Sequence, residues 1–139
     1  MKIESVASVS CIVVDGDAAR HLYRDALQLT FEGGEDDYAF TERLPGVKHM
    51  GLWPLREAAV ACFGVPEWPV EVPVPQASIE FEVGSAQEVS AAARELEEKG
   101  HSPLHDAKEE PWGQTITRLL SPEGLIIGVC YTPWFHDQA

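Results

Sequence analysis

One stretch, residues 77–100, limits the possible folds of this chain more than any other. Apolar and polar residues alternate over residues 78–83, as they do in a strand that buries one face. Ser85 as an N-cap, with Glu88 three positions later, then makes the capping box that begins a helix. The stretch therefore predicts a half-buried strand that runs directly into a helix. The apolar residues of that helix recur at helical spacing and form one stripe: Val89, Ala92, Ala93 and Leu96.

The same strand-to-helix unit occurs about half a chain earlier. Residues 8–14 alternate like a strand, and Asp15 begins a second helical pattern. Such self-similarity within one chain indicates an internal repeat. The sequence therefore predicts an α+β fold of two βαβββ repeats, whose paired curved mixed sheets surround a cavity. The remaining predicted elements are strands at 29–35, 37–43 and 47–53, a short helix at 56–63, and strands at 101–105, 114–120 and 125–131.

A proline-rich segment separates the two repeats. Pro69, Pro73 and Pro75 remove backbone donors and favour an extended linker over a helix or a central strand. The predicted division is residues 1–66 for the first repeat with its short helix, 67–76 for the linker, and 77–139 for the second repeat with a C-terminal tail.

The charge of the chain excludes several classes of partner. The net charge is −13, and only ten Lys and Arg residues are present. Binding to nucleic acid or to an anionic membrane surface needs a basic face, so neither is expected. The acidity either serves solubility or produces a cavity that prefers cationic ligands, because the summed field of a protein concentrates opposite charge.

The location expected from the sequence is the cytoplasm. The chain has no apolar run near the roughly 20 residues that a membrane-spanning helix needs, and its start lacks the apolar region of a signal peptide. Its three cysteines, Cys11, Cys62 and Cys130, are far apart and form no disulfide or metal-binding pattern.

Three short motifs occur in order along the chain. Asp15 is followed eight residues later by Tyr23, residues 110–114 read Glu-Pro-Trp-Gly-Gln, and residues 121–126 read Ser-Pro-Glu-Gly-Leu-Ile. Together they resemble the vicinal oxygen chelate superfamily, which includes glyoxalase I, bleomycin-resistance proteins and extradiol dioxygenases. The resemblance covers nearly the whole chain. It is specific for the fold rather than for an activity, and it implies a homodimer.

The resemblance also implies four positions for the ligands of a divalent metal, on the first and last strand of each repeat. In this chain those positions are Ser8, Gly51, Ser78 and Gly128. Serine is a poor neutral ligand and glycine has no side chain, whereas such metals need carboxylate or imidazole donors. A metalloenzyme of the usual type is therefore disfavoured, and no cofactor is expected. The alternative is a displaced metal site that uses His49, Glu80 and their neighbours.

Strand alternation places four candidate ligand-binding residues on the concave face: His49, Trp53, Glu80 and Glu82. Trp53 offers a large apolar ring whose face attracts cations. Glu80 and Glu82 would complement a positive ligand, or they are simply exposed at a strand edge. His49 beside one of these glutamates would form an acid–base pair without a metal, which makes His49 and Glu80 the catalytic candidates.

A loop in the second half contributes two more candidates, Trp112 and Gln114. Loops held by a rigid scaffold are where binding residues gather, so Trp112 is expected to act as a lid or to stack on a ligand at the mouth of the cavity. A metal site would instead use His105 with Glu109 or Glu110.

These observations favour a small-molecule-binding protein that resembles the metal-free bleomycin-resistance branch and sequesters a cationic or aromatic ligand. The alternative is a metal-dependent lyase, isomerase or oxygenase of the glyoxalase and dioxygenase type with a non-standard metal site. A third possibility is an interaction module with a vestigial cavity. A fold by itself does not choose among these functions.

Overall fold

The computed structural model describes residues 1–33 and 37–136. The chain forms two compact units, which we name the first unit (residues 8–78) and the second unit (residues 1–7 and the chain from residue 79 onward). The unit boundaries fall within strands β1 (Ser5–Val13) and β5 (Ala77–Glu82). In the described part of the chain, no helix is both long enough and apolar enough to cross a bilayer.

The described residues of the first unit carry one βαβββ repeat followed by a helix. Its strands lie in the order β2-β3-β4-β1. β1 runs parallel to β4, with Ser10 opposite Gly51, and β3 is antiparallel to β4. The elements after β1 are α1 (Gly16–Arg20), the π-helix η1 (His21–Ala26), β2 (Glu32–Gly33), β3 (Ala39–Thr41), β4 (Met50–Pro54) and α2 (Leu55–Phe63).

The start of the first helix agrees with the prediction, but the helical segment is not buried. Asp15 caps α1, because its Oδ1 accepts a hydrogen bond from the backbone nitrogen of Ala18 at 3.0 Å. No residue of α1 or η1 is buried, and Leu22 and Leu27 are 48% and 55% exposed. Residues 34 and 35 of the predicted strand 29–35 lie outside the described residues, and among residues 29–33 only Glu32 and Gly33 form a strand, β2.

The second unit carries the other repeat. Its strands lie in the order β5-β8-β7-β6, and β7 is antiparallel to both β8 and β6. Ser85 caps the helix α3 as predicted, since its Oγ accepts from the backbone nitrogen of Glu88 at 3.2 Å. The α+β fold of two βαβββ repeats is therefore confirmed. After β5 come α3 (Ala86–Glu98), β6 (Lys108–Glu109), β7 (Thr115–Leu120), β8 (Ile126–Tyr131) and the 3₁₀ helix η2 (Pro133–Phe135).

One predicted strand is wrong. Residues 101–105 form no strand, and the strand that pairs with β7 at this edge is β6, several residues later. Pro103 cannot donate a backbone hydrogen bond, so a regular ladder is interrupted at that point. Leu104 still donates its backbone N–H to the carbonyl of Arg118 at 2.7 Å, which attaches the segment to β7.

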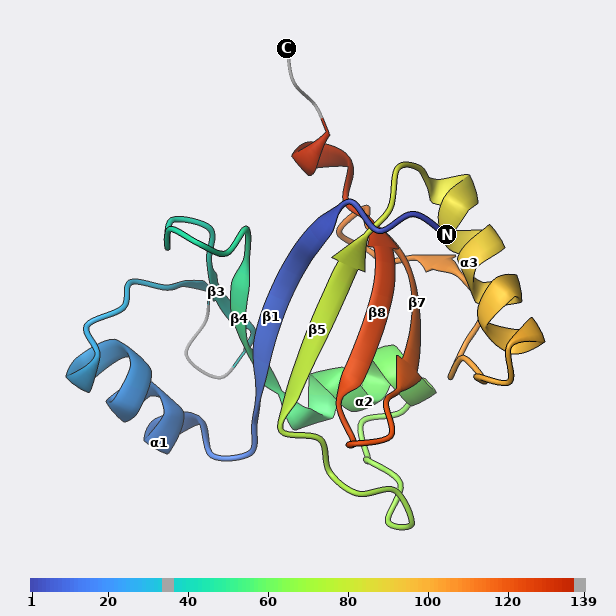
Figure 1. Ribbon diagram of the computed structural model, residues 1–139. Coiled ribbons are helices and arrows are strands. Elements are labelled where there is room, and N and C mark those ends of the chain that lie inside the picture. Colours follow the sequence, from blue (N-terminus) through green and yellow to red (C-terminus); the bar gives the residue numbers. More distant parts are fainter. Residues whose placement is uncertain (34–36, 137–139) are drawn as a thin grey trace. The chain divides into compact units, whose positions relative to one another are not determined.

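The two faces of the second unit's sheet differ in chemistry. Helix α3 lies against one face (Figure 1), where its stripe packs into a core of Val83, Val89, Ala92 and Val129. The opposite face holds Ile116 and Cys130, which are register partners on β7 and β8 and pack with Ala7. This second face is also where the buried polar groups gather.

Candidate functional site

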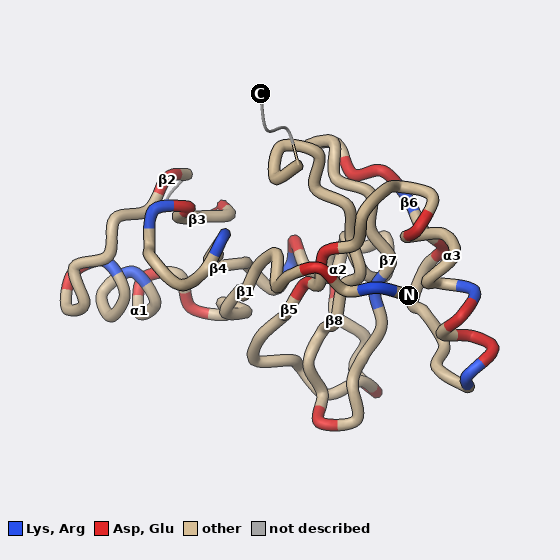
Figure 2. The backbone as a smooth tube through the Cα atoms, turned by 45° about the horizontal axis from the view of Figure 1, so that its top comes forward, with Lys and Arg blue, Asp and Glu red and all other residues tan. Residues whose placement is uncertain are grey.

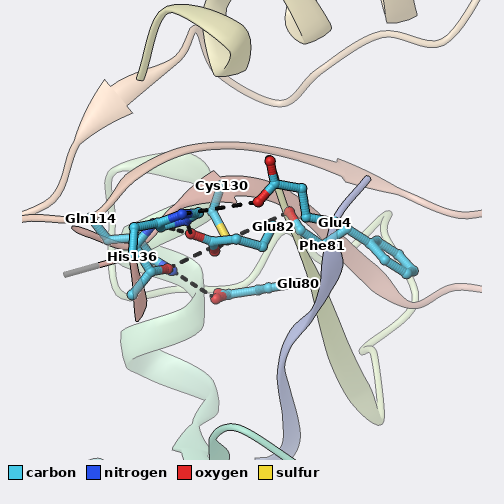
Figure 3. Close-up of polar contacts among 8 residues, drawn as sticks. Glu4, Glu80, Phe81, Glu82, Gln114, Cys130 and His136 are labelled. Atoms are coloured by element: carbon cyan, nitrogen blue, oxygen red, sulfur yellow. Dashed lines mark hydrogen bonds and ion pairs between the residues drawn. The ribbon is translucent and has the colours of Figure 1, made fainter. Parts of the chain in front are cut away.

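A buried carboxylate organises the polar face of the second unit. Glu82 on β5 is only 1% exposed. Its Oε2 accepts from the backbone nitrogen of Thr132 at 2.5 Å and from His136 Nε2 at 2.7 Å, and its Oε1 accepts from Cys130 Sγ at 3.3 Å (Figure 3). All three partners can donate a hydrogen bond, and the two carboxylate oxygens of Glu82 can accept them. We call Glu82, Cys130, Thr132 and His136 the Glu82 cluster.

His136 holds the C-terminal segment against the sheet. It follows η2, its ring stacks on Tyr131 at a centroid distance of 4.8 Å, and its Nδ1 lies 3.9 Å from Glu4 Oε1. The imidazole therefore lies beside two carboxylates, that of Glu4 near the start of the chain and that of Glu82 on β5. The sequence interpretation treated residues 132–139 as a tail and missed His136, because an isolated histidine after two aromatic residues carries no recognisable pattern.

A glutamine extends the polar network along the same face. The Nε2 of Gln114 donates to Glu80 Oε1 and to Thr132 Oγ1, both at 3.0 Å, and its Oε1 accepts from Trp112 Nε1 at 3.1 Å. Gln114 is 6% exposed, whereas Trp112 is 54% exposed. Four of the six candidate ligand-binding residues therefore meet in one hydrogen-bonded network of the second unit: Glu80, Glu82, Trp112 and Gln114.

Cys130 is a structural thiol in this network. Burial raises its pKa far above the usual range, and the nearby carboxylates of Glu80 and Glu82 raise it further. Because the thiolate is the nucleophilic form, a cysteine in this environment is not a reactive one.

The other two ligand-binding candidates, His49 and Trp53, belong to the first unit. His49 Nδ1 lies 2.6 Å from Glu42 Oε2, and His49 Nε2 lies 2.6 Å from the hydroxyl oxygen of Tyr38. These bonds engage both ring nitrogens, so the carboxylate beside His49 is that of Glu42. Trp53, on β4, is 8% exposed. Its position in a cavity remains a prediction.

The sequence interpretation missed Glu42 and Tyr38 as partners of His49. A signal for them exists, because Tyr38, Phe40 and Glu42 occupy alternate positions of the predicted strand 37–43 and would therefore share a face. The Phe40 ring completes the arrangement, with its centroid 5.0 Å from that of His49.

The positions that the family resemblance implies for metal ligands do not suit a metal ion. A Cβ added at Gly51 would overlap the Tyr38 hydroxyl, and one added at Gly128 would lie 2.8 Å from Ile116 Cδ1 and 3.1 Å from Glu80 Cγ. Other side chains therefore fill the space that a ligand at either glycine would need. Among the described residues, no group of three or more His, Cys, Asp or Glu side chains is placed to hold a metal ion.

The alternative metal site at His105 has an arginine, Arg118, beside the histidine. His105 Nε2 lies 3.2 Å from Arg118 Nη1, which is also 3.3 Å from Glu110 Oε1, and His105 Nδ1 bonds to the carbonyl of Asp106 at 2.7 Å. Burial lowers the pKa of His105, and the positive charges of Arg118 and Lys108 lower it further. The neutral imidazole is thus favoured, and Glu110 already pairs with cations on both sides: Lys108 and Arg118.

Comparison with known proteins identifies the fold. No family model and no curated protein sequence matches the chain. A glyoxalase/bleomycin resistance protein/dioxygenase superfamily member from Vibrio splendidus matches 92% of this chain and 100% of its own, at 12% identity and a TM-score of 0.58. The methylmalonyl-CoA epimerase from Mycobacterium tuberculosis matches 98% of this chain and 93% of its own, at 18% identity and a TM-score of 0.58.

A third solved structure adds to this picture. The Mn(II)-bound glyoxalase from Novosphingobium aromaticivorans matches 94% of this chain and 39% of its own, at 18% identity and a TM-score of 0.61. At such identities the likeness concerns the fold and not the activity. The order of elements in the two βαβββ repeats agrees with these matches. The chain therefore has the fold of the glyoxalase/bleomycin resistance protein/dioxygenase superfamily.

Proposed function

We propose that this protein binds a small organic molecule of aromatic or cationic character and does so without a metal at Ser8, Gly51, Ser78 and Gly128. The observation that carries the proposal is the ring cluster of Tyr38, Phe40 and His49 beside Gly51. The three rings are nearly parallel, with interplanar angles of 17° or less and centroid distances of 5.0–6.0 Å.

Stacked rings that are only partly buried offer an aromatic surface to a flat or cationic ligand. Aromatic partners prefer offset stacking on such a surface, and a cation is attracted to the face of a ring. The proposed binding residues of the first unit are His49 and Trp53, and those of the second unit are Glu80, Glu82, Trp112 and Gln114. The net charge of −13 favours cationic over anionic ligands.

The first test is the quenching of tryptophan fluorescence by ethidium, a flat aromatic cation. We expect saturable quenching that is clearly weaker in the Trp53→Phe variant, because Trp53 is the tryptophan of the first unit that is proposed to contact the ligand. Phe40→Ala should weaken ethidium binding about tenfold, since an aromatic contact contributes about 1 kcal/mol or more.

Trp134→Phe is the matched control, because Trp134 is 45% exposed and has no place in the proposed site. Choline and anilinonaphthalene sulfonate separate the contribution of positive charge from that of aromatic surface. If quenching persists unchanged in Trp53→Phe, or if none of the three probes binds, the proposed site is wrong.

An acid–base enzyme is the second candidate, and the contacts of His49 favour it. Glu42, His49 and Tyr38 form a chain of two 2.6 Å bonds, in which a carboxylate orients an imidazole that accepts from a hydroxyl. This is the arrangement by which a histidine takes a proton from a nucleophilic hydroxyl. In this candidate function Tyr38 attacks or transfers a proton, and no metal takes part.

The activated ester p-nitrophenyl acetate tests this relay. The Tyr38 oxygen would attack the acetyl carbonyl, its proton would pass to His49 Nε2, and p-nitrophenolate would leave. We expect acetylation of Tyr38, seen by peptide mass spectrometry, to slow about 100-fold or more in His49→Gln. Tyr131 is the internal control. Equal labelling of Tyr38 and Tyr131, or no effect of His49→Gln, would exclude the relay.

A further inference from the structure

The first unit contains a pocket whose lining differs from the proposed site. It encloses about 90 Å³ and is lined by three arginines, Arg20 on α1, Arg24 on η1 and Arg56 in the first turn of α2. Among the described residues, Asp37 is the one acidic residue of the lining. The walls are otherwise apolar, with Leu52 among them. A single water needs at least about 10–15 Å³ of such space, so the pocket has room for a group of a few heavy atoms.

Three arginines at one small pocket are unexpected in an acidic chain. The protein has ten Lys and Arg residues and a net charge of −13, and three of the ten line this pocket. Figure 2 shows how few basic positions the backbone carries, with some of them in the region of α1. Like charges at close range repel, so the cluster must be offset by acidic side chains or by a bound anion.

Two of these arginines pair with exposed carboxylates of the described residues. Arg20 bonds to Asp17, whose side chain is 93% exposed. Arg56 Nη2 lies 3.4 Å from Asp37 Oδ1, and both side chains are more than half exposed. Exposed ion pairs contribute little, about 0–1 kcal/mol, and exchange readily with other anions. Arg24 makes no ion pair within residues 1–33 and 37–136.

The start of α2 adds a positive end to the same pocket. α2 has nine residues, and its N-cap, Pro54, lines the pocket and makes no side-chain capping bond. Backbone N–H groups in the first turn of a helix have no partner within the helix, and the helix dipole makes that end positive. The pocket thus combines guanidinium groups with a helix start, which is the chemistry that recognises oxyanions.

We propose that this pocket binds the phosphate or carboxylate group of a small anionic molecule. The site is separate from the aromatic one and does not depend on it. Guanidinium groups fit both oxyanions in a bidentate manner, so the two classes share one recognition chemistry.

Titration of the protein with inorganic phosphate, and separately with acetate, tests the proposal at constant ionic strength. Amide shifts in two-dimensional NMR spectra report binding near α2. We expect saturable shifts with at least one anion, and a Kd about tenfold weaker in Arg24→Gln. Arg94→Gln on α3 removes the same charge from an exposed position elsewhere and should leave the Kd unchanged.

The outcomes separate the possibilities clearly. Saturation with phosphate alone, with acetate alone or with both supports the site and identifies its ligand class. Shifts that never saturate, or an equal weakening in Arg24→Gln and Arg94→Gln, would show a general charge effect and overturn the proposal. The ethidium experiment has separate variants, so failure of one proposal does not affect the other.

Discussion

Replacing Glu82 with alanine is expected to lower the free energy of unfolding by about 3 kcal/mol. The backbone N–H of Thr132, a residue that is 1% exposed, would lose its acceptor, and a buried unpaired donor costs about 1–3 kcal/mol. The bond to His136 would also be lost, and removal of a fully buried side chain leaves a cavity that adds to the cost. Urea denaturation followed by circular dichroism measures the difference.

Two variants show whether the effect comes from the buried acceptor. Glu82→Gln keeps a carbonyl oxygen of the same shape and should retain part of the stability, because the Thr132 bond can persist. Glu123→Ala removes a carboxylate from an exposed turn and should change the stability by less than about 0.5 kcal/mol. A loss below about 1 kcal/mol in Glu82→Ala would mean that the Glu82 cluster contributes little to the fold.

The second large effect is expected at Gly128. In Gly128→Ala the new methyl group would lie 2.8 Å from Ile116 Cδ1 and 3.1 Å from Glu80 Cγ. Ile116 is fully buried, so neither it nor the strand can move away freely. We expect destabilisation of about 1–3 kcal/mol, the usual cost of overpacking a core. The result would show directly that position 128 has no space for a metal ligand.

A double-mutant cycle tests the physical cause. Ile116→Val removes the Cδ1 that the new methyl group would meet, and alone it should cost about 0.5–1.5 kcal/mol. If steric overlap is the cause, Gly128→Ala with Ile116→Val should cost about 1 kcal/mol less than the sum of the single changes. Additive effects would exclude overlap with Ile116 and point to Glu80 or to the backbone.

The elements of the fold were largely predictable because their signals are local. The alternation in residues 78–83 and the capping residues Asp15 and Ser85 each depend on neighbours within four positions, and the structure contains the strand and both caps. The burial of that strand differs from the prediction, because Ser78 and Glu82 are each only 1% exposed. The edge strand was misplaced because short strands at an edge carry few residues and hence a weak pattern. Pro103, which argues against a strand at 101–105, was the available signal.

Several residues of the candidate site were predictable from the sequence, but the hydrogen-bonded pairs that they form were not. The sequence drew attention to His49 and Glu82, yet the partner of His49 is Glu42, and the partner of Glu82 is His136, 54 positions away. Strand alternation determines which face a side chain occupies, but it does not determine which residue of another strand or loop lies beside it.

The sequence by itself determined the repeat, the caps, the acidic character and the absence of metal-binding side chains at Ser8, Gly51, Ser78 and Gly128. Only the tertiary structure decided that Tyr38 and Glu80 fill the space above two of those positions, and that three arginines meet at one pocket. The physical reason is range. Backbone propensity and capping act over a few residues, whereas hydrogen bonds, steric contact and charge clustering join residues that are brought together by the folding of the chain.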